Sequence, residues 1–169
     1  MKENMEKNLQ LCVQELGALG SRLISPQTVI VAEWVRWKCQ FGCWGYGNRL
    51  TCPPCSPTPQ QTRSLLQGYS KALLVHGERS FSVRYIISQL EKEAFLAGCY
   101  KAIGMGAGPC RLCEECAIPN PCRRSTEARP SMEACGIDVF QTVLDSGFDI
   151  HVLKNPKEVG NYFGLLLLE

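Results

Sequence analysis

The chain has 169 residues, of which 45% are hydrophobic and 20% charged, and its formal net charge is +2. This composition excludes a disordered chain, and so small a charge gives no reason to expect nucleic acid or an anionic membrane surface as a partner. No apolar run approaches the roughly 20 residues that a membrane helix needs. We therefore expect one domain spanning residues 1–169, with neither a nucleic-acid nor a membrane partner.

Eleven residues are cysteines, which is an odd number and a high share for a chain of this length. The first six residues are polar and do not form the apolar segment of a secretory signal. The expected compartment is therefore the cytoplasm, where clustered cysteines indicate metal binding or catalysis rather than disulfides.

Two elements are predicted before the first cysteine group. Apolar residues at helical spacing predict an amphipathic helix from Glu3 to about Leu19, within an N-terminal segment 1–24, and Cys12 is expected to serve as a small core hydrophobe. The stripe consists of Met5, Leu9, Cys12, Val13 and Leu16. Residues Thr28 to Lys38 are β-branched and aromatic and follow a proline, so they predict a strand.

The first cysteine loop, residues 39–59, is rich in glycine and proline and has no periodicity. Its cysteines are separated by three, eight and two residues, and they are Cys39, Cys43, Cys52 and Cys55. Two short-spaced pairs suit a tetrahedral zinc site, and the same four thiols suit a cubane iron–sulfur cluster. The spacing leaves both possibilities open.

The middle of the chain alternates helices and strands. Thr58, Pro59 and Gln61 form a capping box that begins a helix ending near Gly68. A buried strand is predicted at 71–76, a regular helix at 80–97 and a strand at 99–103. This alternation predicts an α/β fold, a compact single domain with a mixed, partly parallel sheet flanked by helices and with both cysteine loops at strand ends.

The second cysteine loop, residues 108–136, carries the strongest chemical signal. Four cysteines fall within 13 residues, three of them at successive spacings of three, and they are Cys110, Cys113, Cys116 and Cys122. This run resembles in kind the loop with which ferredoxins hold a 4Fe-4S cluster, although five residues precede its last cysteine and Arg123 follows it. Zinc sites more often use two separated pairs, so the run favours iron–sulfur over zinc.

The glycines before this loop and the elements after it complete the prediction. Gly104, Gly106 and Gly108 do not open a helix, so we interpret them as positions where the backbone approaches a cluster rather than as a dinucleotide fingerprint. Asp138 is expected to cap a helix over 139–145, and strands are expected at 149–153 and 162–168. The two histidines, His76 and His151, are expected to be structural.

Four stretches of the sequence resemble Domain of Unknown Function family 2284, described as predicted metal-binding proteins largely of anaerobic bacteria and archaea. They are Trp37–Cys43, Leu50–Pro54, Gly108–Cys113 and Arg129–Val139. The resemblance implies metal binding at Cys39, Cys43, Cys52, Cys110, Cys113, Cys116 and Cys122. Cys135 lies inside a family motif, so it competes with Cys55 as the fourth ligand of the first site.

Three functions are compatible with these residues. The first is electron transfer through one or two 4Fe-4S clusters to a redox partner protein, with docking aided by Arg111, Arg123, Arg124 and Arg129. The second is a cluster-dependent enzyme or cofactor-processing protein with an open iron site, in which Cys99 or Cys135 serves as a redox thiol. The third is a zinc-stabilised interaction module. No nucleophile motif or phosphate loop assigns catalytic residues, and the oligomeric state is not predicted.

Overall fold

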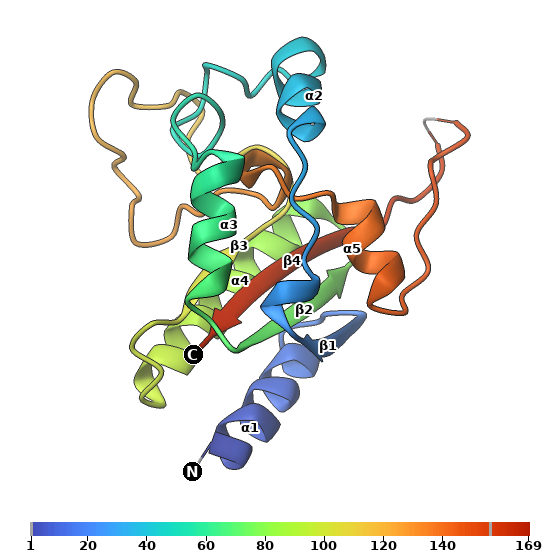
Figure 1. Ribbon diagram of the computed structural model, residues 1–169. Helices are drawn as coiled ribbons and strands as arrows, with labels where there is room; N and C mark the ends of the chain where they lie inside the picture. Colours follow the sequence, from blue (N-terminus) through green and yellow to red (C-terminus); the bar gives the residue numbers. More distant parts are fainter. Residues whose placement is uncertain (1, 156) are drawn as a thin grey trace.

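A single four-stranded sheet in the order β1-β2-β4-β3 forms the centre of the molecule (Figure 1). The computed structural model describes residues 2–155 and 157–169, and side chains from Lys7 onward. The strands are β1 (Gly20–Ile24), β2 (Lys71–Gly77), β3 (Ile103–Met105) and β4 (Tyr162–Leu168). The helices are α1 (Lys2–Glu15), α2 (Trp34–Gly42), α3 (Pro59–Gln67), α4 (Ser80–Leu96) and α5 (Val139–Asp145), with short 3-10 turns η1 (Pro26–Thr28) and η2 (Glu133–Cys135).

Neighbouring strands of the sheet are antiparallel throughout, so the predicted partly parallel sheet is wrong. The prediction expected β2, α4 and β3 to form a parallel crossover unit. The two strands do run in the same direction, but β4 lies between them and pairs in the antiparallel sense with both. The strand that separates them, β4, comes last in the sequence. The alternation of helices and strands along the chain does not indicate that this strand inserts between the other two.

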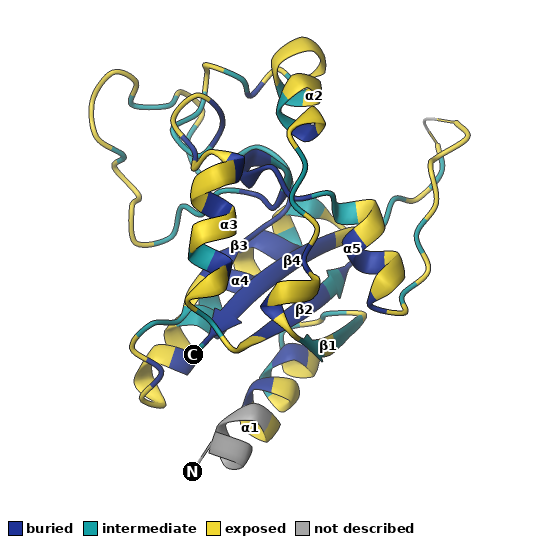
Figure 2. Ribbon diagram, in the orientation of Figure 1, coloured by how far each residue is buried: buried dark blue, intermediate teal, exposed yellow. Residues whose placement is uncertain are grey.

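The sheet is buried on both faces, because its strands alternate side chains between two hydrophobic cores (Figure 2). Leu166 and Leu168 of β4 face α1 and α4, where they meet Ile87 and Leu90. The alternate residues of the same strand, Leu165 and Leu167, face the core under α3, η2 and α5. Both cores therefore share β2 and β4, so these two strands are held in place from both faces of the sheet.

Most predicted helices are confirmed. The capping box of α3 is formed, with the Thr58 hydroxyl accepting from the Gln61 N–H at 3.2 Å and the Gln61 side chain accepting from the Thr58 N–H at 2.8 Å. The Asp138 carboxylate caps α5 by accepting from the Gln141 N–H at 3.1 Å. Helix α1 ends at Glu15, before the left-handed Gly17, and Cys12 packs against the first core as expected. Met5 lies outside the residues whose side chains are described.

Three predicted strands are wrong, and β1 was not predicted within the N-terminal segment. Residues 28–38 form the end of η1, an irregular link and the start of α2. The helical conformation places Val35 and Cys39 one turn apart, so that both side chains line a cleft described below. The strand predicted at 99–103 begins at Ile103. Residues 149–153 form no strand, and most of their side chains are exposed. In consequence the first cysteine loop follows a helix rather than a strand, and Cys39 belongs to that helix.

Two of the three glycines before the second loop serve packing. A Cβ on Gly104 would lie 2.3 Å from Ile87 Cγ2, and one on Gly106 would lie 3.2 Å from Arg84 Cγ, so both let β3 approach α4. The sequence alone suggests that the backbone approaches a cluster at these glycines. In the structure, Gly104 and Gly106 instead allow close packing of β3 on α4. Gly108, with φ of 63°, turns the chain into the cysteine loop.

No helix among the described residues is long and apolar enough to cross a membrane.

Candidate metal centre

The two cysteine loops lie side by side: in Figure 1 the first loop continues from α2, and the second lies on the side of the first that faces away from α2. The Arg49 guanidinium of the first loop donates to the Glu114 carbonyl of the second at 3.0 Å. The Leu50 N–H donates to Cys116 Sγ at 3.3 Å, and the N–H of Cys110 reaches the Cys52 sulfur. The structure thus brings the two cysteine groups together, and all eleven cysteines are free thiols.

The four cysteines of the second loop line one small cavity of about 20 Å³. Arg49, Leu50 and Thr51 of the first loop close it from the other side. Cys110, Cys113, Cys116 and Cys122 are all partly buried. The structure therefore groups the four residues that the spacing had selected, around a space that holds about one water-sized sphere.

The surroundings of Cys116 favour its thiolate form. Burial acts to raise its pKa, but backbone N–H groups of Leu50, Ile118 and Ala117 and the nearby Arg49 guanidinium outweigh burial, so the pKa lies below its ordinary value. Backbone N–H groups pointing at cysteine sulfur are the surroundings that tune iron–sulfur ligands.

A buried arginine supports the start of the second loop. The Arg84 guanidinium of α4 is 5% exposed and donates to the backbone carbonyls of Ala107 at 2.8 Å and Pro109 at 2.6 Å. Burial lowers the pKa of Arg84, and negative charge at Cys110 and Cys52 acts in the opposite direction. A positive charge is therefore fixed beneath thiols of both groups.

Three cysteines of the first loop line the end of a larger cleft: Cys39, Cys43 and Cys52. Cys39 lies in the last turn of α2, with its sulfur 3.9 Å from the Glu133 carbonyl of η2. Burial, followed by the neighbouring Cys43, raises the pKa of Cys39 to about 11. Burial also raises the pKa of Cys52. Without metal, both residues are protonated thiols near neutral pH.

The two residues that compete as a fourth ligand of this group, Cys55 and Cys135, lie outside the cleft lining. Cys55 is exposed on the loop surface. Cys135 is 0% exposed and belongs to the second hydrophobic core, where burial raises its pKa to about 12. The side chain of Cys135 occupies the place of a small hydrophobe.

Neither cysteine group is closed around a metal ion as it stands. Within the described parts of the chain, no three His, Cys, Asp or Glu side chains converge closely enough to hold one. Any metal at these thiols therefore requires the loops to adjust around it.

The arginines around the second loop have differing partners. Arg129 forms a largely buried ion pair with Glu91 of α4, donating to its carboxylate at 2.7 Å, and Arg124 pairs with Glu127. Arg111 lies over the Trp44 ring at 5.3 Å, and Arg49 lies over the same ring at 5.1 Å. The indole therefore joins the two loops, and two of the four arginines proposed for docking are neutralised by acids.

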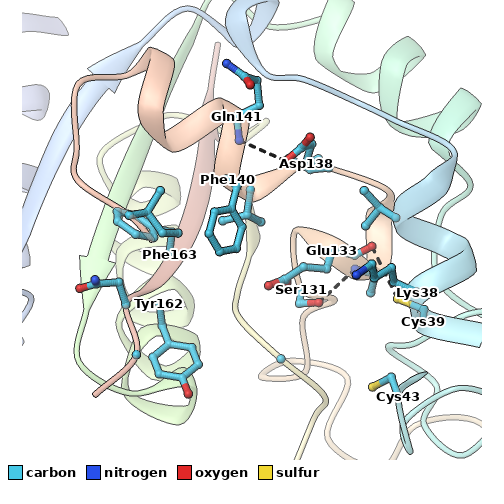
Figure 3. A pocket seen from close by; sticks show the side chains of 18 of the residues that line it. Lys38, Cys39, Cys43, Ser131, Glu133, Asp138, Phe140, Gln141, Tyr162 and Phe163 are labelled. Carbon is cyan, nitrogen blue, oxygen red and sulfur yellow. Dashed lines mark hydrogen bonds between the residues drawn. The ribbon is translucent and has the colours of Figure 1, made fainter. Parts of the chain in front are cut away.

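The cleft beside the first group has a volume of about 840 Å³ and extends from the thiols to α5 and β4 (Figure 3). Its wall is largely apolar and includes Trp34, Val35, Ile137, Phe140, Leu144 and Phe163. Glu133 points into it, and one of its carboxyl oxygens, Oε2, is buried without a hydrogen-bond partner.

The histidines are engaged in structural contacts. His76 Nε2 lies 2.7 Å from the Asn161 side-chain oxygen, and its ring stacks on Phe163 with centroids 4.6 Å apart. His151 pairs with Glu158 at 2.9 Å.

Sequence reasoning missed three residues of this region: Arg49, Arg84 and Glu133. Arg84 had a detectable signal, because an arginine interrupts the apolar stripe of the predicted helix at a position that faces the core. Glu133 and Arg49 gave no such signal, since their positions depend on how the loops pack.

Comparison with known proteins gives one match. The family model of predicted metal-binding proteins (DUF2284) matches residues 22–168. No curated protein and no solved structure matches the chain. Because the matched region includes both cysteine groups and every element after α1 except the first two residues of β1, the chain belongs to the DUF2284 family of predicted metal-binding proteins.

Proposed function

We propose that the chain binds two iron–sulfur clusters, one at each cysteine group, and acts as a redox protein that exchanges single electrons with a partner protein. The observation that carries this proposal is the second cysteine group, in which four thiols line one cavity and backbone N–H groups point at Cys116 sulfur. A 4Fe-4S cluster, when bound, accepts and releases single electrons. The family description supports metal binding in general.

Residues around the second group suit a negatively charged centre. Cys110, Cys113, Cys116 and Cys122 would hold the metal. Four thiolates carry negative charge, which the buried Arg84 and the N–H groups around Cys116 stabilise. Within the described residues, Arg111 and Arg123 form no ion pair with a carboxylate, and they would face an acidic docking surface.

At the first group, Cys39, Cys43 and Cys52 would hold the metal from the end of the cleft. Neither Cys55 nor Cys135 lines the cleft. We infer a site with three protein ligands, which leaves one position facing the cleft. This arrangement favours a second candidate function, a cluster-dependent enzyme, and the cleft is the specific observation behind it.

A third candidate is a structural zinc ion at the second group, because four thiols that line one cavity are a ligand set that zinc also takes. Loading either kind of metal centre requires the loop to adjust. Residues 114, 115, 119, 120, 121, 123 and 124 of the loop are exposed, so such a movement leaves both cores intact.

The deciding experiment is the iron, sulfide and zinc content of anaerobically purified protein, with electron paramagnetic resonance before and after reduction. Two clusters give about eight irons and eight sulfides per chain. Cys116→Ser should reduce the iron content by about half, and Cys39→Ser should do the same independently. Cys55→Ser is the matched control and should leave the iron content unchanged, because this residue is exposed outside the cleft. Zinc without iron would overturn the redox proposal in favour of the structural module.

A further inference from the structure

The cleft beside the first cysteine group has the size and lining of a small-molecule site. Its volume of about 840 Å³ falls within the range of roughly 300–1,000 Å³ typical of such sites. Aromatic side chains contribute to its wall from three separate parts of the chain: α2, α5 and β4. They are Trp34, Phe140, Tyr162 and Phe163. Flat aromatic walls favour a ligand with a ring system.

The charges of the wall argue against an anionic ligand. Two acidic side chains, Glu133 and Asp138, and one lysine, Lys38, line the cleft. Asp138 uses one oxygen to cap α5. A cationic ligand would lose most of its hydration against the apolar wall, so a neutral ligand fits best.

Glu133 supplies the polar contact that would orient such a ligand. Burial raises the pKa of its carboxyl group, against the effect of donors on its own backbone, Ser131 and Gly108, and Oε2 is buried without a partner. Figure 3 shows this side chain pointing into the cleft, with Phe140 on one side and Cys39 and Cys43 on the other. A buried acceptor left without a donor is costly, and a ligand N–H or O–H would satisfy it.

We propose that this cleft binds a neutral, largely apolar ring compound that donates an N–H or O–H hydrogen bond to Glu133 and lies beside Cys39, Cys43 and Cys52. That the ligand would meet a metal there rests on the proposed function. Binding of the compound depends on the cleft alone and needs no metal. If the protein is an enzyme, this class of compound is its expected substrate class.

The test uses N-phenyl-1-naphthylamine, a neutral two-ring compound with one N–H whose fluorescence rises in apolar surroundings. Its affinity for the full chain is compared with that of 1-phenoxynaphthalene, which has nearly the same shape but an ether oxygen in place of the N–H and is measured by displacement. The amine should bind about tenfold more tightly, as expected for one hydrogen bond to a buried carboxyl group.

Two variants locate the site. Leu144→Trp places a larger side chain in the wall and should weaken binding of both compounds by more than about tenfold. Leu11→Trp, on the exposed face of α1 outside the cleft, is its control and should change nothing. Glu133→Gln places an N–H₂ group where Oε2 lies and should abolish or reverse the preference for the amine.

Absence of binding, equal affinity of the two compounds, or an unchanged affinity in Leu144→Trp would overturn the proposal. The amine and ether comparison uses the natural sequence, so it stands even if the Glu133 variant does not fold. Metal content measured on the same samples separates the two proposals. If the compound binds and the protein contains no metal, the cleft proposal stands and the redox proposal is refuted. If the protein contains iron and the compound does not bind, the redox proposal stands and the cleft proposal is refuted.

Discussion

At the scale of single residues, Arg84 is the side chain on which the second cysteine loop depends most directly. Its guanidinium lies in a buried position of α4 and holds the carbonyls of Ala107, Gly108 and Pro109, the three residues that precede Cys110. One nitrogen, Nε, is buried without a partner. Burying a charged side chain with one unpaired donor costs free energy. We infer that Arg84 serves to hold the start of the loop in place rather than to fill the core.

Arg84→Met keeps most of the side-chain volume and removes the donors. We expect the free energy of unfolding to fall by about 2 kcal/mol, because buried carbonyls lose their hydrogen bonds. Loss of metal to a chelator should also become faster at the second group. Urea unfolding and chelator kinetics measure the two effects. Arg79→Met, at an exposed arginine before the same helix, is the control, and equal behaviour of the two variants would contradict the role of Arg84.

Cys116 and Cys39 should differ in thiol reactivity in metal-free protein. The pKa of Cys116 is lowered and that of Cys39 is raised to about 11, so the thiolate fraction at pH 8 is larger at Cys116. Reactivity of Cys116 should reach its plateau at a lower pH, whereas that of Cys39 should still be rising at pH 10. Peptide mapping after timed alkylation with iodoacetamide gives both rates. Faster alkylation of Cys39 at pH 8 would contradict the proposed surroundings of Cys116.

The candidate site was predictable where its residues are close in sequence. The spacing of Cys110, Cys113 and Cys116 already selects one loop, and the structure groups these residues around one cavity. Contacts between loops were not predictable, because they depend on tertiary packing. The donation from Leu50 to Cys116 and the place of Glu133 beside Cys39 both belong to this class.

At the scale of elements, α2 shows why a local pattern failed. Its β-branched and aromatic residues favour a strand by propensity, yet the chain forms a helix that turns Val35 and Cys39 toward the same cleft. By contrast, α3 and α5 carry capping residues that act within four positions, so their starts were predicted correctly. Local capping signals located α3 and α5, whereas the conformation of α2 and the pairing of the strands depend on tertiary contacts.

The contact between β3 and α4 gives a prediction for a pair of glycines. Gly104→Ala places a methyl group 2.3 Å from Ile87 Cγ2, so the free energy of unfolding should fall by about 1–3 kcal/mol. Gly42→Ala, in α2, meets no atom within 4 Å and should leave stability unchanged or raise it by up to about 1 kcal/mol. Thermal or urea unfolding of both variants measures the difference. A neutral Gly104→Ala would show that β3 does not pack this closely.

At the scale of the whole molecule, the parts of the cysteine loops at residues 43–57 and 110–129 lie outside both hydrophobic cores. Both hydrophobic cores lie on the sheet, and the thiols of the second group belong to neither. Residues 1–169 are accordingly proposed to unfold as one unit, while the loops order separately.

Removal of metal should therefore affect the loops alone. In metal-free protein we expect amide exchange in residues 43–57 and 110–129 to accelerate by at least about tenfold, while exchange in β2 and β4 stays slow. Hydrogen exchange followed by mass spectrometry, with and without metal, measures this difference. Equal protection of the loops in both states would contradict a metal-ordered site, and loss of protection in β4 would contradict an independent scaffold.

The position of β4 within the sheet also sets an order of events during synthesis. This strand follows both cysteine groups in the sequence, yet it joins β2 to β3 at the centre of the sheet. While the ribosome is still making residues 162–168, β3 has no neighbour, and the loop that follows it has no fixed base. If the metal-bound loop needs this base, we expect metal to be held firmly only after β4 has been made, when a single late strand has completed the base for the second loop.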